Sequence, residues 1–472
     1  MSRMRHSLWC ALLIAGCAVG PHYHRPAIEA PAAWKEASAP AAGWQEARPQ
    51  DAVERGEWWA VFHDPELDVL EVQAVHTNLS IEAALHRLEH ARAVARLPQA
   101  NLLPTLVLNP SYSHFQRTLS SFGGAGTLTN DTFRVPFDLS YEVDLWGKVR
   151  RSFEAAHAEA QASQAAYESV LLSVTAETAR SYFSARALDA ELEALRKTVE
   201  LRREAQRLVD QRVDAGLSSD LDRARVMAEV KTAEAESYDV ERRRAELEHA
   251  LAVLCGRAPA EFTLAAHPLA EDPPAVPAGI PSTALERRPD IAEAERLMAV
   301  SNARIGAAQA ASFPVLSLTG SAGWEGAKAD QVLRADNVVW SLGPSLSVPL
   351  FAGGRNRANL RAARADHAQA SAEYRRRVLA AFQEVEDALA AIRLLDRQQQ
   401  AQAEVVEATQ RAQQLSIDRY AQGLSSFLDA VDAERARLDA LRRAAQIRGQ
   451  RLTAAVVLIK ALGGGWDAAG AS

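Results

Sequence analysis

Four residues, Gly-Leu-Ser-Ser, occur twice in this chain, each time inside a tract that otherwise reads as unbroken helix. The first copy lies in QRVDAGLSSDLDRARV (211–226) and the second in DRYAQGLSSFLDAVDAE (418–434). Glycine readily adopts the left-handed conformation that ends a helix, and a serine that follows it can cap the next helix. Each copy therefore predicts a hairpin turn in which either of the two serines is the cap. The turn residues are Gly216, Leu217, Ser218 and Ser219 in the first copy, and Gly423, Leu424, Ser425 and Ser426 in the second.

The two turns belong to a tandem duplication. The turn glycines are 207 residues apart, and the same offset relates Gly147 to Gly354. Further upstream the offset becomes 210, as between Pro104 and Pro314. The chain therefore contains one long unit twice, with a period far longer than that of solenoid repeats.

The tracts on both sides of the turns predict long helices. Residues 148–255 contain no proline and a single glycine, and they are rich in residues that favour helix. Apolar residues spaced by three and four positions, such as Leu188, Leu192 and Leu195, indicate a coiled-coil seam. Shorter helices are expected over 66–100 and 290–312.

Helix lengths predict how these segments stack. A helix over 148–215 would be about 100 Å long, and the return helix over 217–254 about 57 Å. The helix over 290–312 adds about 35 Å, so the two shorter helices placed end to end nearly match the long one. The proline-rich segment between them would form a belt at mid-height.

Four stretches have the alternation of strands, with apolar residues at every second position and aromatics near their ends. Each has the length of a tilted membrane strand, roughly 9–11 residues plus its rims. After the N-terminal leader no run of 18 apolar residues occurs, so a membrane-crossing form of this chain would use its strands as a closed barrel. Four strands are fewer than the roughly eight of the smallest known barrels, so the chain would oligomerise through its strand edges. A periplasmic β-domain is the alternative. The stretches are 104–118, 132–146, 314–325 and 337–351, and Pro344 interrupts the last.

The N-terminus has the layout of a secretory signal peptide. A basic segment with Arg3 and Arg5 precedes a short apolar run that ends in IAGC (14–17). IAGC resembles the bacterial lipobox, in which the cysteine becomes the lipidated first residue. Cys17 is therefore the expected attachment site of a diacylglycerol and an N-acyl chain such as palmitate, and Ala18 favours the outer membrane. A plain signal peptide with a chance cysteine is the alternative.

Composition excludes several classes of function. The net charge is −7 without a basic patch, so nucleic acid is not an expected partner. The three cysteines and the pair His22 and His24 show no metal-ligand spacing, so no metal site is expected. Cys255 is expected to be a small buried residue. No GxSxG or HExxH motif occurs, so no enzyme is expected and no cofactor besides the lipid.

The order of these features resembles the outer-membrane efflux protein family, the TolC- and OprM-type channels, in its NodT-like lipoprotein branch. RRPDIAEAE (287–295) and RYAQGLSSFLDAVDAE (419–434) carry the resemblance together with the lipobox and the duplication. It implies an α+β membrane protein, a homotrimer with a twelve-stranded β-barrel built from four strands per chain. The barrel would continue into a long periplasmic α-helical barrel with a mixed equatorial domain.

The resemblance also implies the function and the partners. The chain would be the exit duct of a tripartite efflux pump for drugs or other small toxic compounds, without catalysis of its own. Its partners would be a periplasmic adaptor, an inner-membrane transporter of RND, MFS or ABC type, and outer-membrane lipid. A non-channel, coiled-coil lipoprotein that acts as a spacer in the cell envelope is the alternative.

This plan assigns each part of the chain. The expected parts are a signal peptide (1–16), a lipidated N-terminal segment that wraps the equatorial region (17–65), a first repeat (66–256), an equatorial linker (257–288), a second repeat (289–463) and a C-terminal tail (464–472).

In the family the two turns dock the adaptor, and the second also narrows the closed pore. The matching pore residues are Tyr420 before the turn and Asp429 and Asp432 after it. Three-fold symmetry would make each aspartate a ring of like charges that attracts cations. Ser425 stands where the family has an arginine, so Asp418 and Arg419 are the candidate latch. A solvated helix face is the alternative for the two aspartates after the turn.

Overall fold

The protein is described here from a computed structural model of the 472-residue chain. It describes residues 18–26, 31, 33–36, 56–118, 126–267, 269, 273–274 and 287–464. The expected signal peptide, Cys17 and the C-terminal tail beyond residue 464 lie outside the described residues, as does half of the expected linker. Within the described part, no helix is long and apolar enough to cross a membrane.

The chain forms two compact units, and each draws on both repeats. The first comprises Met1–Ala27, Arg87–Gln164 and Glu293–Arg375, and it contains all the strands. The second comprises Ile28–His86, Ala165–Ala292 and Arg376–Ser472, and it contains both helix turns.

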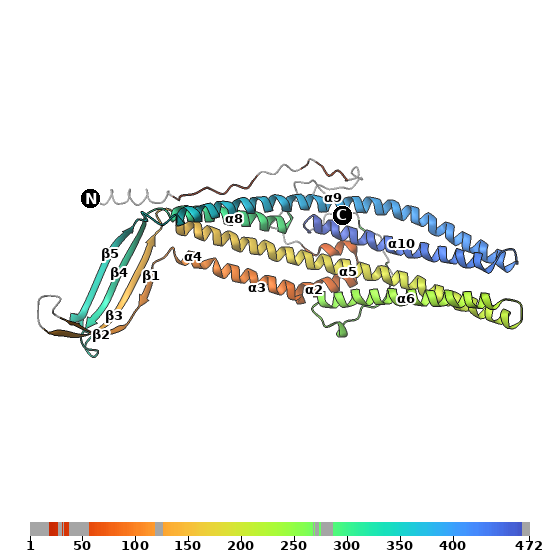
Figure 1. Ribbon diagram of the computed structural model, residues 1–472, viewed down its shortest axis with the longest axis horizontal. Helices are drawn as coiled ribbons and strands as arrows, with labels where there is room; N and C mark the ends of the chain where they lie inside the picture. The colour runs from red at the N-terminus through yellow and green to blue at the C-terminus, as the bar shows by residue number, and fades with distance from the viewer. Residues whose placement is uncertain are drawn as a thin grey trace. The chain divides into compact units, whose positions relative to one another are not determined.

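The first unit is built on an antiparallel sheet (Figure 1). Its strand order is β1-β3-β4-β5, and β2 pairs with β3 as well. β1 and β2 follow one another along the same edge of β3, so the sheet is four strands wide. The strands are β1 (Thr105–Leu108), β2 (Ser111–Thr118), β3 (Thr127–Val143), β4 (Val315–Gly326) and β5 (Val338–Ser347).

The strand predicted over 104–118 is therefore corrected to two strands. Pro110 has no N–H to donate to the ladder, which ends β1 and lets β2 start afresh. Asn109 keeps one bond to β3, because its N–H donates to the carbonyl oxygen of Pro136 at 3.1 Å. β3 also begins five residues before the predicted 132, whereas Pro344 is accommodated because β5 is an edge strand.

The register gives the sheet two chemically different faces. On one face Phe137, Ala322 and Trp340 lie side by side across three strands. On the other face Arg134 forms an ion pair with Glu325 at 3.0 Å. Side chains alternate along a strand, so every second residue belongs to the apolar face, as the sequence predicted. The apolar face further carries Val135, Leu139, Tyr141, Val143, Leu316, Leu318, Trp324, Val338, Leu342 and Leu346.

Shorter helices occur in both units. α8 (Pro289–Ala310) runs beside the first part of α9 (Figure 1) and packs on the start of α5 through small side chains, including Ala155 and Ala303. The helix predicted over 66–100 is broken into α2 (Pro65–Thr77), α3 (Leu79–Val94) and α4 (Arg96–Ala100). The first break has a local cause, because the Asn78 side chain accepts the N–H of Ser80 at 2.9 Å and caps α3.

The helical hairpins have equal lengths in the two repeats, which confirms the duplication. α5 (Lys148–Asp214) and α9 (Arg355–Ala421) each have 67 residues. α6 (Asp220–Leu254) and α10 (Phe427–Ala461) each have 35. The long helices contribute residues to both units, and the turns that follow them belong to the second unit.

The second unit has an aromatic core beside α2. The 3-10 helices η2 (Trp58–Phe62) and η4 (Pro259–Glu261) flank this core, and Phe62 lies 4.9 Å from Phe183 between ring centroids. Cys255 is fully buried in the same core, as predicted, and burial raises the pKa of its thiol to about 11. Burial also raises the pKa of the Glu71 carboxyl to about 9, so this side chain is neutral at pH 7.

Candidate functional site

The two predicted turns have the same backbone geometry. Gly216 and Gly423 both have φ of +72°, the left-handed region that glycine adopts without strain. In the first turn the N–H of Leu217 donates to the Arg212 carbonyl at 2.7 Å, and in the second Leu424 donates to the Arg419 carbonyl at 2.8 Å. With the bond from each glycine N–H to the carbonyl three residues earlier, this is the Schellman arrangement that ends helices.

The caps of the return helices are Ser219 and Ser426, which decides between the two serines of each turn. Each serine hydroxyl accepts the N–H of the third helical residue, Asp222 or Asp429, at 3.3 Å. The aspartate reaches back in turn, and the Asp429 carboxylate accepts the N–H of Ser426 at 2.9 Å. Both turns therefore close with a capping box.

Asp429 consequently has a structural role that the sequence did not show. Hydrogen bonds from Ser426 lower the pKa of its carboxyl below the usual range, which keeps the cap ionised at neutral pH. Asp432 lies one turn further and pairs with Arg435 at 3.5 Å. Asp418 accepts a bond from Gln414 at 3.1 Å. Of the predicted gate residues, Asp429 is thus held by the turn itself, and the gate roles of all five residues, Asp429 included, stay predictions.

We expect Ser426→Ala to destabilise the first turn of α10 by about 1 kcal/mol, because the N–H of Asp429 loses its acceptor. Hydrogen exchange of the amides at 427–430 measures this fraying. Ser425→Ala is the matched control, since the Ser425 hydroxyl is buried without a hydrogen-bond partner in the described structure. Equal exchange in both variants would contradict the capping role.

Tyr420 connects the two hairpins. Arg212, near the end of α5, donates a hydrogen bond to the Tyr420 hydroxyl on α9 at 3.0 Å. Its guanidinium carbon also lies 5.8 Å from the centre of the tyrosine ring. The sequence singled out Tyr420 but missed Arg212, which the 207-residue offset marked only as the counterpart of Arg419. The contact joins two helices about two hundred residues apart, so no local pattern could have revealed it.

A groove of about 390 Å³ lies beside this contact. Leu208, Val209 and Leu217 give it an apolar wall, and Arg212 and Tyr420 give it a polar end. Leu208 and Leu217 are largely exposed to solvent. The groove therefore offers apolar surface next to hydrogen-bonding groups, the combination that protein-binding pockets use.

The two turns differ in how strongly their own helices are joined. In the first hairpin Arg223 binds Asp210 at 3.1 Å and Asp220 at 3.3 Å, and it also binds Asp214. In the second hairpin Ala430 stands at the position of Arg223. The first turn is therefore held by ion pairs across the hairpin, whereas the second has no counterpart of this cation.

Ion pairs also join the second hairpin to the first. Arg202 of α5 binds Glu434 of α10 at 2.9 Å, and Arg442 of α10 binds Glu191 of α5 at 2.8 Å. Arg435 binds Glu229 of α6. Glu191 is fully buried and Arg202 is nearly so. Separation of the two hairpins therefore has to break buried charge pairs, which makes the separation costly.

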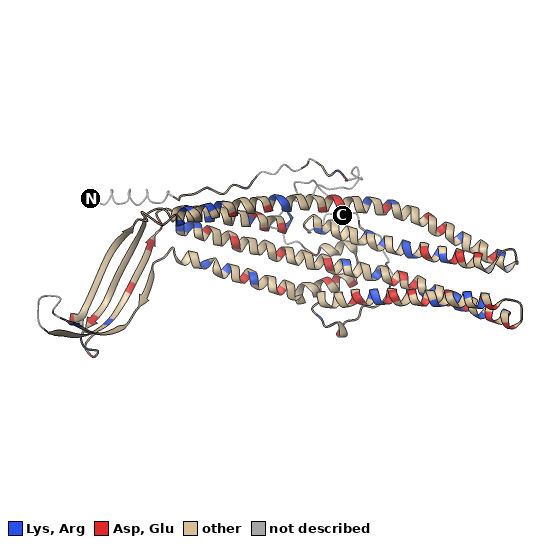
Figure 2. Cartoon of the chain, in the orientation of Figure 1, with Lys and Arg blue, Asp and Glu red and all other residues tan. Residues whose placement is uncertain are grey.

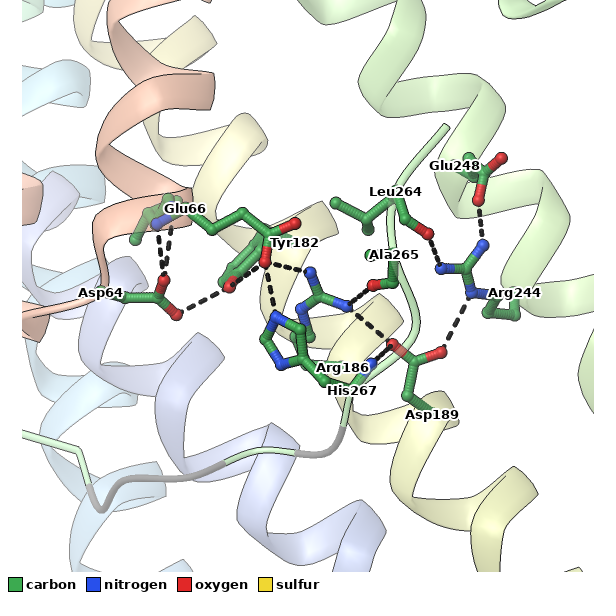
Figure 3. A network of polar contacts seen from close by, with 11 residues as sticks. Asp64, Glu66, Tyr182, Arg186, Asp189, Arg244, Glu248, Leu264, Ala265 and His267 are labelled. Carbon is green, nitrogen blue, oxygen red and sulfur yellow. Dashed lines mark hydrogen bonds and ion pairs between the residues drawn. The ribbon is translucent and has the colours of Figure 1, made fainter. Parts of the chain in front are cut away.

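A second buried network ties α2 and residues 264–267 of the expected linker to the first hairpin (Figure 3). Arg186 of α5 is at its centre and binds Asp189 at 2.8 Å and the carboxylate of Glu66. Arg244 of α6 binds the other oxygen of Asp189 at 3.0 Å. The carbonyls of Leu264 and Ala265 accept from Arg244 and Arg186, and His267 contacts Glu66. The network therefore joins α2, α5, α6 and residues 264–267 around the guanidinium group of Arg186.

RRPDI (287–291) has a structural role. Pro289 begins α8, and Arg288 binds Asp290 at 2.8 Å and Glu384 of α9 at 2.6 Å. Arg288 also donates to the Ala461 carbonyl near the end of α10 at 3.0 Å. The motif therefore joins the start of α8 to the second hairpin. Among the described residues, no group of His, Cys, Asp and Glu is arranged to hold a metal ion.

Comparison with known proteins identifies the class. The family model for outer membrane efflux proteins matches residues 70–257 and 280–464. The chain is 34% identical over 469 residues to the outer membrane protein OprJ of Pseudomonas aeruginosa, covering 98% of this chain and 95% of OprJ.

Solved structures agree with the sequence relatives. The structure of the outer-membrane channel OprN superposes with a TM-score of 0.88 at 30% identity, over 95% of this chain and all (100%) of OprN. The open state of the Neisseria gonorrhoeae MtrE outer membrane channel gives 0.82 at 31% identity, over 95% of this chain and 98% of MtrE.

Together, the two-faced sheet, the paired helical hairpins and these matches define an outer-membrane channel protein. The chain belongs to the outer membrane efflux protein family. It is a transport protein of the outer membrane that extends into the periplasm. The family is one of channels rather than of enzymes.

Proposed function

We propose that this chain forms a homotrimeric exit duct for a tripartite efflux pump, with a twelve-stranded β-barrel above a periplasmic α-helical barrel. The observation that carries this proposal is the sheet, which is four strands wide and apolar on one face only. Strands that face lipid on one side and water on the other have this alternation. Three such sheets joined edge to edge supply twelve strands and leave no open edge in the membrane.

The polar face would then line the water-filled path. Arg134, Asp138, Glu142 and Glu325 lie on it, together with serines and threonines of β4 and β5. The apolar face would contact the acyl chains, with Trp324, Trp340 and Tyr141 among its aromatic residues. Cargo would cross passively, because the inner-membrane transporter supplies the energy. Small toxic compounds such as drugs are the proposed cargo.

The two Gly-Leu-Ser-Ser helix turns would dock a periplasmic adaptor. The groove beside Leu208 and Leu217 supports this assignment, because it presents exposed apolar side chains next to Arg212 and Tyr420. The adaptor would couple the duct to a transporter of RND, MFS or ABC type. The Arg212–Tyr420 contact would be one closing contact of the gate, beside Asp418, Arg419 and Asp432.

The proposed membrane anchoring has two parts, the barrel and a lipid on Cys17. The alternative function, a coiled-coil spacer, would use the lipid alone. The division of the chain into signal peptide, lipidated segment, two repeats, linker and tail stays part of the proposal.

Membrane extraction and conductance test the proposal together. We would express the chain with a non-lipoprotein leader and Cys17→Ser, beside the wild type, and wash the membranes with alkaline carbonate. A channel stays in the membrane without its lipid, purifies as a trimer and conducts ions in planar bilayers. A spacer leaves the membrane with the Cys17→Ser change, and a folded trimer without conductance would also overturn the duct.

A further inference from the structure

Four arginines lie exposed at the start of α9 without a partner. Arg355, Arg357, Arg361 and Arg364 are all exposed to solvent. None of their guanidinium groups makes a hydrogen bond or ion pair with another residue of the described chain. Figure 2 shows basic residues gathered where α9 begins, beside the ends of the strands. Four unpaired cations within ten residues repel one another, so this surface favours an anion from outside the chain.

The first repeat provides an internal comparison, because its basic residues at the same place are paired. Lys148 binds Glu142 at 3.1 Å and Arg150 binds Asp144 at 3.2 Å. Arg151 binds Glu154 at 2.7 Å. At an offset of 207 the three carboxylates are replaced in the second repeat by Pro349, Phe351 and Arg361. At this offset the second repeat keeps two of the three cations, as Arg355 and Arg357, has Ala358 in place of Arg151, and has lost all three carboxylates.

Helix geometry places three of the arginines on one stripe. Arg357, Arg361 and Arg364 are spaced by four and three residues, so they share a face of α9. A different face packs inward, where Ala363 is buried and His367 contacts Ser301 at 3.1 Å. The first carboxylate on α9, Asp366, is nine residues from Arg357, which is about half a turn around the helix. The stripe is therefore cationic along its length.

The stripe directly follows apolar surface. Leu350 and Phe351, between β5 and α9, are each 92% exposed. Leu350 follows four residues after Leu346, which is also exposed and lies on the apolar face of β5. From Arg357 to Arg364 the helix rises about 10 Å. The headgroup layer on each side of a bilayer is about 5–7 Å thick, so a stripe of this length that starts at the apolar edge reaches across it.

We propose that Arg357, Arg361 and Arg364, with Arg355 beside them, bind the phosphates of anionic phospholipids in the periplasmic leaflet of the outer membrane. The inference rests on the proposed insertion of the sheet in that membrane. Guanidinium groups match phosphate oxygens in geometry and are less strongly hydrated than ammonium groups. Leu350 and Phe351 would contact the acyl chains immediately above. The site would set the depth and orientation of the duct in the membrane.

Native mass spectrometry of the purified trimer tests the proposal. The trimer would be equilibrated in detergent micelles doped with phosphatidylglycerol or with phosphatidylcholine, and bound lipids would be counted. Each basic residue near an anionic lipid surface contributes about fivefold to affinity. We expect R357Q/R361Q/R364Q to lower the affinity for phosphatidylglycerol by at least about tenfold while phosphatidylcholine binding stays the same.

The control removes the same charge from other exposed helix positions. K197Q/R207Q/R443Q replaces three basic residues that are between 68% and 71% exposed and paired only with exposed carboxylates. Such pairs contribute little to stability. This variant is expected to bind phosphatidylglycerol like the wild type. If the glutamine variant does not fold, R357K/R361K/R364K replaces it, and phosphatidylglycerol binding close to that of the wild type is expected, because the charge is kept.

Three results would overturn the inference. Unchanged phosphatidylglycerol binding in the glutamine variant, or its loss in the lysine variant, would show that the arginines do not hold the headgroup by charge. If the glutamine variant dissociates from the trimer without a change in lipid binding, the stripe contacts the neighbouring protomer and not lipid. A changed ion selectivity with unchanged lipid binding would place it on the water-filled path. Failure of the wild type to stay in carbonate-washed membranes would instead count against the proposed function.

Discussion

Arg186→Met is expected to lower the free energy of unfolding by about 3 kcal/mol, because it removes a buried cation that binds the buried carboxylate of Asp189 and the half-buried carboxylate of Glu66. The Arg186 side chain is 1% exposed and binds Asp189, which is 2% exposed, as well as Glu66. Methionine fills much of the volume but donates no hydrogen bond. Arg244 still neutralises one oxygen of Asp189, so Glu66 and the Ala265 carbonyl are the groups that lose most.

Thermal unfolding in detergent, followed by circular dichroism at a fixed scan rate, measures this effect. Arg180→Met is the matched control, because Arg180 lies on the same helix and pairs with Glu177 in an exposed position, where it is 49% exposed. We expect the control to change stability by less than about 0.5 kcal/mol. A midpoint for Arg186→Met within one or two degrees of the control would show that the network adds little to stability.

The second large effect is expected at the helix turns, where Arg212→Ala should raise single-channel conductance. The Arg212–Tyr420 hydrogen bond joins the two hairpins at 3.0 Å. A bond of this kind contributes about 0.5–1.5 kcal/mol net. If the three protomers of the trimer open together, losing three bonds shifts the ratio of closed to open channels by at least about tenfold. Planar-bilayer recordings of wild type and variant measure the change.

Two further variants decide which groups close the channel. Tyr420→Phe removes the accepting hydroxyl but keeps the ring, so it is expected to open the channel less than Arg212→Ala. Arg419→Ala changes the counterpart of Arg212 in the second repeat, the latch residue that the sequence suggested. Opening by Arg419→Ala but not by Arg212→Ala would favour that latch. Asp432→Ala is the cleaner test of a gate aspartate, since Asp429→Ala also removes the cap of α10.

The turns show how far local sequence carries a prediction. Both left-handed glycines could be predicted, and so could a serine cap in each turn, because these conformations depend on residues within one helical turn; which of the two serines is the cap came from the structure. The role of Asp429 was missed, although its spacing from Ser426 is that of a capping box. The negative charge of Asp429 suggested a role in the gate, which stays a prediction. In the structure its carboxylate is hydrogen-bonded within the turn.

For the sheet, too, local features could be predicted from the sequence, whereas the pairing of distant strands could not. Alternation of apolar and polar residues predicted the strands and their two faces, because side chains of a strand alternate whatever it pairs with. The break at Pro110 was a local signal that the prediction did not use. Which strands pair, and in which register, depends on contacts between the two repeats, since β3 pairs with β4 across about 180 residues of chain.

The hairpin turns, the long helices and the strand faces could be predicted from the chain alone, because each follows from residues close together in it, and the duplication could be predicted from the repeated order of these features. The contacts that hold these elements together came from the fold. Arg212 reaches Tyr420, and Arg186 gathers carboxylates and carbonyls from separate segments. Arg357 and its neighbours were ordinary charged residues until the fold showed them unpaired beside an apolar surface. Pairing and burial of charge depend on positions far apart in the chain, so no periodicity records them.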